Sequence, residues 1–108
     1  MNKFLFIVIF MSFVKIHASE KKFQKADSLF TSGNIDESIT LLQSILVNNL
    51  ESSEIYYNLG ICHFALENYQ ESKKFFNKSL YLNPNIILNL TEMIEQCNNK
   101  LNMANCYA

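Results

Sequence analysis

The sequence contains no arginine, a single proline and only two glycines. Arginine supplies the planar, bidentate fork that recognises phosphates and carboxylates, so its absence argues against a nucleic-acid or anion-binding role. The shortage of glycine and proline, together with a hydrophobic content of 49%, favours an ordered helical chain over a disordered one. A length of 108 residues is enough for one small domain.

The N-terminal stretch MNKFLFIVIFMSFVKIHASE has the features of a secretory signal peptide. Lys3 gives a positive flank, residues 4–14 form an apolar run too short to cross an ordinary bilayer as a helix, and a cleavage site follows Ala18. Residues 1–18 are therefore predicted to direct the chain to the periplasm or out of the cell. The alternative is an uncleaved segment that anchors the chain in a membrane through residues 4–14. Cleavage would leave a net charge of −3, which gives no attraction to DNA or to anionic lipid.

The chain is similar to itself at an offset of 34 residues. Residues 19–49 align with residues 53–83 without a gap and with eight identities, and the apolar residues recur at the spacing of one helix face. This pattern predicts two helices in each unit. Their expected ranges are 20–32 and 36–47 in the first unit, then 53–66 and 70–82 in the second.

Turn and cap residues support these boundaries. Gly33 provides the left-handed backbone between the first two helices, and Asn68 is predicted to provide it between the next two. Ser52 and Ser53 are both candidate N-caps, and Pro84 is expected to close the fourth helix.

One more helix is predicted at the C-terminal end, where a single apolar stripe faces a polar back. The stripe consists of Ile86, Leu90, Met93, Ile94, Cys97 and Leu101. Such a helix suits the end of a helical stack, and Ile94, standing where the second unit has Gly60, should block a further partner helix. The predicted organisation is a signal peptide (1–18), repeat one (19–52), repeat two (53–86), a capping helix (86–103) that ends the domain of residues 19–103, and a short tail (104–108).

The period and the residues at fixed offsets resemble the tetratricopeptide repeat. The residues that carry the resemblance are Tyr56, Leu59, Gly60, His63, Ser72, Phe76, Ser79 and Pro84 in the second unit, with Ala26, Gly33, Ser38 and Leu42 in the first. Lys22 and Lys25 stand where the family usually has an aromatic residue and a leucine. The resemblance implies an all-α helical solenoid of two helix-turn-helix repeats plus a C-terminal capping helix.

A second resemblance concerns the phrase YYNLGICHFALENYQESKKFF behind a signal peptide. In this respect the chain is similar to the N-terminal tetratricopeptide part of Bat-type proteins of the Bacteroides group. Those proteins continue into membrane-spanning and SH3-like parts that this sequence does not contain.

The tetratricopeptide resemblance also implies a function, because the first helices of such repeats line a concave groove that holds a partner segment. Carried over by position, the groove residues are Phe23, Asp27, Phe30, Glu54, Tyr57, Asn58, Ile61 and Phe64. Asn58 matches the family's clamp for a C-terminal carboxylate, but Phe23 and Asp27 replace its other members, so that clamp is not expected. The groove is instead aromatic and mildly acidic, which suits an apolar or basic segment. Under the alternative interpretation, Phe23, Phe30 and Phe64 are simply half-buried between helices.

The predicted function is that of an exported, non-catalytic protein–protein interaction module, an adaptor or assembly factor whose partner is a protein or peptide. No nucleic acid, small-molecule substrate, metal or other cofactor is expected. Self-association is left open, because stacked repeats usually need three or more units for stability. A membrane-tethered scaffold is the alternative if the N-terminal segment is not cleaved.

An exported thiol enzyme is the least favoured function. Cys62 and His63 are adjacent, and adjacent residues on a helix point about 100° apart, so they do not face each other. His63 is expected to be packed and hydrogen-bonded rather than catalytic. Cys62 and Cys97 are expected to be buried thiols, although a disulfide between them stays open because both lie on helices predicted to pack together.

Overall fold

The computed structural model describes residues 20–48 and 51–106, with the backbone alone for residues 86–89 and 104–106. The predicted signal peptide or anchor, residues 1–18, lies outside the described residues.

The described part of the chain contains five α-helices. They are a first helix at residues 20–31, α2 (Ile35–Val47), α3 (Ser53–Ala65), α4 (Tyr69–Leu82) and α5 (Ile87–Cys106), with a 3₁₀ turn, η1 (Pro84–Ile86), before the last. Each predicted helix is present with ends within one residue of the expected ones, except that α5 continues to Cys106.

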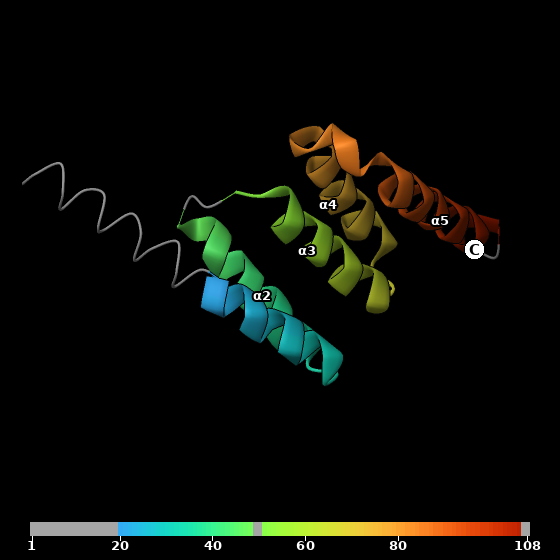
Figure 1. Cartoon of the computed structure of the whole chain (residues 1–108). Helices are drawn as coiled ribbons and strands as arrows, with labels where there is room; N and C mark the ends of the chain where they lie inside the picture. Colours follow the sequence, from blue (N-terminus) through green and yellow to red (C-terminus); the bar gives the residue numbers. More distant parts are fainter. Residues whose placement is uncertain (1–19, 49–50, 107–108) are drawn as a thin grey trace, which may run out of the picture.

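The helices pack as neighbours along the chain. The first helix and α2 form one antiparallel pair, α3 and α4 form the second, and α5 lies against α4 (Figure 1). The expected all-α stack of two helix pairs and a capping helix is therefore confirmed. Among the helices that the structure describes, none is both long and apolar enough to cross a membrane.

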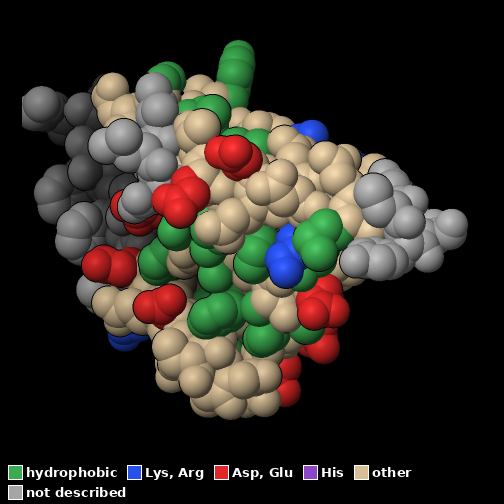
Figure 2. Space-filling view, turned by 90° about the vertical axis from the view of Figure 1, so that its right-hand side faces the viewer, with side chains coloured by type: hydrophobic (Ala, Val, Ile, Leu, Met, Phe, Trp, Pro, Cys, Tyr) green, Lys and Arg blue, Asp and Glu red, His purple; other side chains and the backbone are tan. Residues whose placement is uncertain are grey.

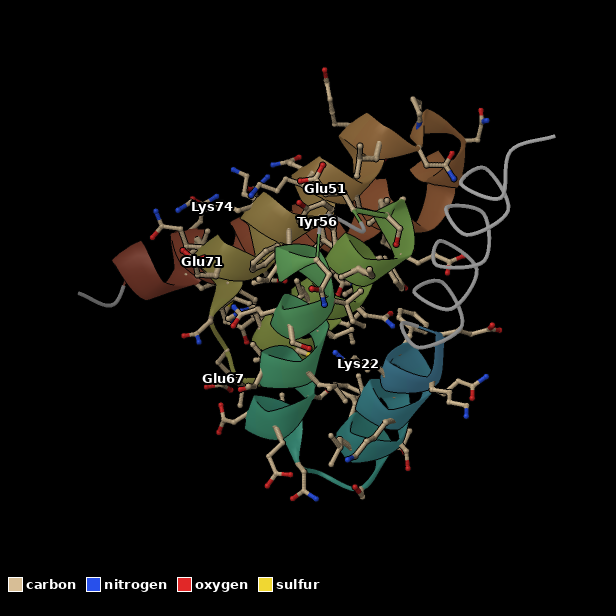
Figure 3. The ribbon with its side chains drawn as sticks, turned by 90° about the vertical axis from the view of Figure 1, so that its left-hand side faces the viewer. Lys22, Glu51, Tyr56, Glu67, Glu71 and Lys74 are labelled. Carbon is tan, nitrogen blue, oxygen red and sulfur yellow. The ribbon has the colours of Figure 1, made fainter. Side chains whose placement is uncertain are left out.

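The turns inside the two pairs have the same geometry, and they correct one prediction. Gly33 has φ +89°, and its equivalent in the second pair, Glu67, has φ +62°. Asn68 has φ −86°, because its carbonyl accepts the backbone N–H of Ser72 at 2.9 Å and so begins α4. The prediction that Asn68 adopts the left-handed conformation is thus wrong. A glutamate in this conformation costs about 1 kcal/mol, and it lies at the end of α3 opposite to Glu51 (Figure 3).

The two serines before and at the start of α3 have different roles. The Ser52 hydroxyl accepts the backbone N–H of Ile55 at 3.2 Å, which confirms it as the N-cap. The Ser53 hydroxyl instead donates to the Ser79 carbonyl at 2.9 Å, and the buried Ser79 hydroxyl donates to the Ser53 carbonyl at 2.7 Å. This reciprocal pair joins the start of α3 to the last turn of α4.

Buried side chains form two clusters. The first consists of Ala26, Ile39, Leu42, Ile45, Ile55, Tyr56, Leu59 and Cys62. The second consists of Phe76, Leu90 and Cys97, and several half-buried residues of α3 and α5 pack against it. The first cluster joins the first helix, α2 and α3, and the second joins α4 to α5.

Gly60 lies against the ring of Phe76 within the second pair. A Cβ at this position would be 2.5 Å from both Cδ1 and Cε1 of that ring, a distance that real side chains do not reach. The missing side chain of Gly60 therefore lets α4 approach α3 closely, and the group that uses the space is the Phe76 ring. The equivalent pair in repeat one is Ala26 and Leu42, both 1% exposed, so each repeat combines one small and one large residue here.

A serine and a cysteine mark each interface between successive pairs. In repeat one the buried Ser38 hydroxyl donates to the Ala26 carbonyl at 2.7 Å and accepts the Cys62 thiol at 3.8 Å. In repeat two the buried Ser72 hydroxyl donates to the Gly60 carbonyl at 2.7 Å and accepts the thiol of Cys97, whose Sγ lies 3.6 Å away. The same hydrogen-bonded arrangement therefore recurs in both repeats.

These contacts show whether Cys62 and Cys97 form a disulfide and which residue of α5 is equivalent to Gly60. Cys62 and Cys97 are free, buried thiols at different interfaces, so the disulfide that was left open between them is not formed in the structure. The cysteines are 35 positions apart and the serines 34, which places α5 one residue out of the repeat register. If Cys97 is taken as the equivalent of Cys62, the equivalent of Gly60 is the exposed Glu95 and not Ile94, as the sequence had predicted. Ile94 is half-buried against the second cluster.

Candidate functional site

A cavity of about 200 Å³ lies between the first helix and α3, above α2. Its buried floor is formed by Ala26, Ser38, Leu42 and Cys62. Its rim is formed by the exposed Asp27 and by the half-buried Phe30, Tyr57, Asn58 and Ile61. Buried core residues thus bound the cavity on one side, and exposed or half-buried residues of the first helix and α3 bound it on the other.

Helical spacing explains why these residues meet. Tyr57 and Ile61 are four apart, as are Asn58 and Cys62, and residues four apart lie one above the other on a helix face. Two adjacent columns of α3 therefore face the first helix. The first helix contributes the exposed rim residue Asp27 and, directly before it, the buried floor residue Ala26.

Five of the eight predicted groove residues line this cavity: Asp27, Phe30, Tyr57, Asn58 and Ile61. Glu54 is exposed at the start of α3 and does not line it. Phe23 is half-buried against the first cluster, and Phe64 is half-buried against the second, with its ring 5.2 Å from that of Tyr69 in an edge-on contact. Phe30 also packs against the first cluster, so all three phenylalanines pack between helices as in the alternative interpretation, although Phe30 lines the cavity as well. The part that the other residues play in binding stays a prediction.

The polar groups at the rim have no partners within the described residues. The Asp27 carboxylate forms no ion pair there, and neither the Asn58 carboxamide nor the Tyr57 hydroxyl forms a hydrogen bond. Polar groups that converge on an apolar hollow without internal partners are free to orient a bound molecule. No three metal-binding side chains cluster in the part of the chain that the structure describes.

The thiol at the floor is poorly suited to chemistry. Burial raises the pKa of Cys62 most, the hydrogen bond with Ser38 lowers it by less, and the negative charge of Asp27 adds a smaller rise. Because the thiolate is the nucleophilic form, a raised pKa makes this cysteine less reactive than a free one.

Comparison with known proteins finds similarity over α3, which lines the cavity, and over α4. Residues 53–86, which comprise α3, α4 and η1, match the family model of the tetratricopeptide repeat. Residues 53–86 are thus similar to one tetratricopeptide repeat. A NADPH oxidase activator from Dictyostelium discoideum is 32% identical over 60 residues, which make up 56% of this chain and 9% of that protein. The chain thus spans less than a tenth of that relative's length.

The match confirms the predicted repeat and helical solenoid, and it supports a role as a protein–protein interaction module, since tetratricopeptide repeats generally mediate such interactions. Within the repeat, the signature residues Leu59, Ser72, Phe76 and Ser79 are fully buried. The resemblance to Bat-type proteins stays a prediction.

His63, another position of the repeat signature, is part of an aromatic stack between α3 and α4. Its ring lies 5.3 Å from that of Phe75 with an interplanar angle of 16°, and Tyr56 stacks on Phe75 at 6.2 Å. The expectation that His63 is packed is confirmed. The expectation of a hydrogen bond is wrong for one of its nitrogens, because the buried Nδ1 has no partner within the described residues.

Two charged residues complete this stack at the start of α3. The Tyr56 hydroxyl donates to the Glu51 carboxylate at 2.8 Å (Figure 3). The Lys78 ammonium lies 5.4 Å from the centre of the Tyr56 ring. Burial, followed by the hydrogen bond and the charge of Glu51, raises the pKa of Tyr56. The stack stabilises the α3–α4 pair and is separate from the cavity.

Sequence reasoning did not identify the floor of the cavity as part of the site. Ala26, Ser38 and Leu42 were recognised only as structural positions of the repeat, and Cys62 only as a buried thiol. Helical spacing from Asn58 indicates Cys62, but the contribution of α2 depends on how the helices pack.

Proposed function

We propose that the chain is an exported, non-catalytic tetratricopeptide-repeat module that binds an extended segment of a partner protein in the cavity between the first helix and α3. The observation that carries this proposal is the combination of an apolar hollow with a rim of polar groups that have no partner among the described residues. Burial of an apolar side chain in such a hollow supplies binding free energy, and the polar rim sets the orientation of the bound chain.

The charge at the rim of the cavity supports a partner that is apolar or basic, because Asp27 is the charged residue among those that line it. On the side of the molecule toward which α5 runs, Figure 2 shows hydrophobic side chains gathered in the middle, with a lysine among them and acidic side chains at several points around them. The Asp27 carboxylate attracts a segment that carries positive charge and repels an acidic one.

A non-catalytic role is consistent with the chemistry of the site. Its one thiol has a raised pKa and is 2% exposed, which argues against the thiol enzyme considered from the sequence. The remaining lining groups, a carboxylate, a carboxamide and a phenol, are common features of peptide-binding surfaces.

Export rests on the N-terminal sequence. A short apolar run of residues 4–14 followed by a cleavage site after Ala18 supports secretion, and the uncleaved segment would make the chain a membrane-tethered scaffold. N-terminal sequencing of the protein from its native cells distinguishes the two. A mature chain that begins at Ser19 is expected, whereas an intact Met1 in the membrane fraction would establish the tethered form.

The binding function is tested with a random peptide display library selected against the folded chain. Enriched peptides are expected to bind the Asn58→Ala variant about three- to tenfold more weakly, the effect of losing one hydrogen bond. Asn99→Ala is the matched control, because Asn99 is exposed on α5 and does not line the cavity. Substitution of Tyr57 or Phe64 is less informative, because both side chains also pack against the second cluster.

The proposal fails if no peptide is enriched although circular dichroism shows a folded helical chain. It also fails if the enriched peptides bind Asn58→Ala, Asn99→Ala and the unchanged protein equally. Self-association, which would add a second copy as a partner, stays a prediction that sedimentation equilibrium tests.

A further inference from the structure

We infer that the partner segment inserts one aromatic or leucine-sized side chain into the cavity and carries a lysine or arginine next to it. This inference rests on the proposed function, and it adds the chemistry of the residue that the cavity holds.

The size of the cavity sets the anchor. An apolar cavity of about 150 Å³ holds one benzene molecule, so the 200 Å³ present here can take a phenyl ring or a leucine side chain but not two such groups. Phe30, Tyr57 and Ile61 form its walls. Two aromatic rings and a branched aliphatic group favour an aromatic anchor, because rings pack edge-to-face and offset against one another.

The charge at the rim sets the neighbour of the anchor. Asp27 is the single carboxylate among the lining residues, no lysine lines the cavity, and this carboxylate forms no ion pair within the described residues. Lys25, on the same helix, lines a different hollow together with Asp36 and Glu37. The charge of Asp27 also acts on the floor, since it is among the causes that raise the pKa of Cys62. A cation beside the anchor would lie close to this carboxylate, whereas an acidic residue there would be repelled.

Short synthetic peptides test both parts. Each has one phenylalanine in a serine–glycine frame, and the next residue is lysine, glutamine or glutamate; a fourth peptide has alanine in place of phenylalanine and keeps the lysine. Binding is measured by fluorescence anisotropy at low and at high salt. The lysine peptide is expected to bind about fivefold or more tightly than the glutamate peptide, and the difference should shrink at high salt. The alanine peptide should bind at least tenfold more weakly than the lysine peptide.

Two charge-reversal variants locate the effect. Asp27→Lys should invert the order of the lysine and glutamate peptides. Glu54→Lys makes the same change in charge on α3 but outside the cavity, and it should leave the order intact. Both positions are exposed, so neither substitution disturbs the core.

The outcomes separate this inference from the proposed function. Equal binding of the lysine and glutamate peptides to the unchanged protein, or an effect of Glu54→Lys as large as that of Asp27→Lys, would overturn the basic neighbour. Equal binding of the alanine and phenylalanine peptides would overturn the anchor. If none of these peptides binds but the display library yields ligands that depend on Asn58, the inference is wrong and the proposed function stands. If the library also yields none, the proposed function itself fails.

Discussion

Replacing Gly60 with alanine would add one methyl group against the ring of Phe76. The new Cβ would lie 2.5 Å from Cδ1 and Cε1 of the ring and 3.0 Å from Cζ. The ring cannot move away freely, because Phe76 is completely buried and its centre lies 5.9 Å from that of Tyr57. The substitution is therefore expected to overpack the interface between α3 and α4.

Two opposing effects decide the size of the change. Alanine is better than glycine inside a helix by about 1 kcal/mol. Overpacking of a well-filled core costs about 1–3 kcal/mol. The net loss for Gly60→Ala is then on the order of 1 kcal/mol, which lowers the melting temperature of a domain of this size by about 4–8 °C. Gly60→Leu should be considerably worse, because its side chain needs the whole space of the ring.

Repeat one provides the matched control, since its equivalent pair is Ala26 and Leu42. Phe76→Leu alone should cost about 1–2 kcal/mol, because it leaves a void beside the glycine. In the double variant Gly60→Ala/Phe76→Leu the new methyl group occupies part of that void, so repeat two acquires the small-and-large pair of repeat one. The double variant should be less destabilised than the sum of the single ones by about 1–2 kcal/mol.

Urea unfolding of the four proteins, followed by circular dichroism, measures this coupling. Independent sites add within about 0.5 kcal/mol. Additivity to that degree, or a Gly60→Ala variant more stable than the unchanged chain, would refute the argument that Phe76 occupies the space of the missing side chain.

Three further predictions concern buried polar groups. Ser72→Ala should lower the free energy of unfolding by about 1 kcal/mol, because it removes the side-chain hydrogen bond to the Gly60 carbonyl and leaves the buried Cys97 thiol without its acceptor; no change in the urea midpoint would contradict this. The free energy of unfolding should fall above about pH 9. The fold raises the pKa of Cys62 and Tyr56 above their ordinary values of 9.0 and 10.0, and this contribution to stability is fully present below those ordinary values. It is lost as the pH rises through the raised pKa values of the folded chain. Cys62→Ala should remove the lower part of that fall in pH-dependent thermal melts, and an unchanged profile would count against it. His63→Phe keeps the stack on Phe75 and removes a buried nitrogen without a partner, so the melting temperature should rise by a few degrees; a decrease would show that this nitrogen is stabilised in solution.

At the turn after α3, the conformational preference of single residues predicted the wrong position, whereas alignment of the two repeats gives the right one. Asparagine tolerates the left-handed conformation better than glutamate, so Asn68 was the expected residue. However, Glu67 is the equivalent of Gly33, and the asparagine that follows must begin the next helix. The geometry of the turn therefore outweighs the preference of the residue.

The candidate site was predictable only in part for a related reason. The resemblance to the tetratricopeptide repeat, carried over by position, identified Asp27, Phe30, Tyr57, Asn58 and Ile61 as groove residues, and these five line the cavity. Which of the neighbouring aromatic side chains are used for packing depends on helices that lie further along the chain. Phe64, for example, is covered by Tyr69 and the second cluster.

The sequence by itself determined the helices, their pairing and the repeat, because apolar periodicity and caps act within a few turns of one helix and recur after 34 residues. Only the tertiary structure decided the state of the cysteines, the register of α5 and the floor of the cavity. Cys62 lies on α3 and Cys97 on α5, and each thiol donates to the serine of the helix that precedes its own, Ser38 on α2 and Ser72 on α4. The physical reason is that such contacts depend on the crossing of two helices, and a shift of one residue, as in α5, changes which side chains face each other.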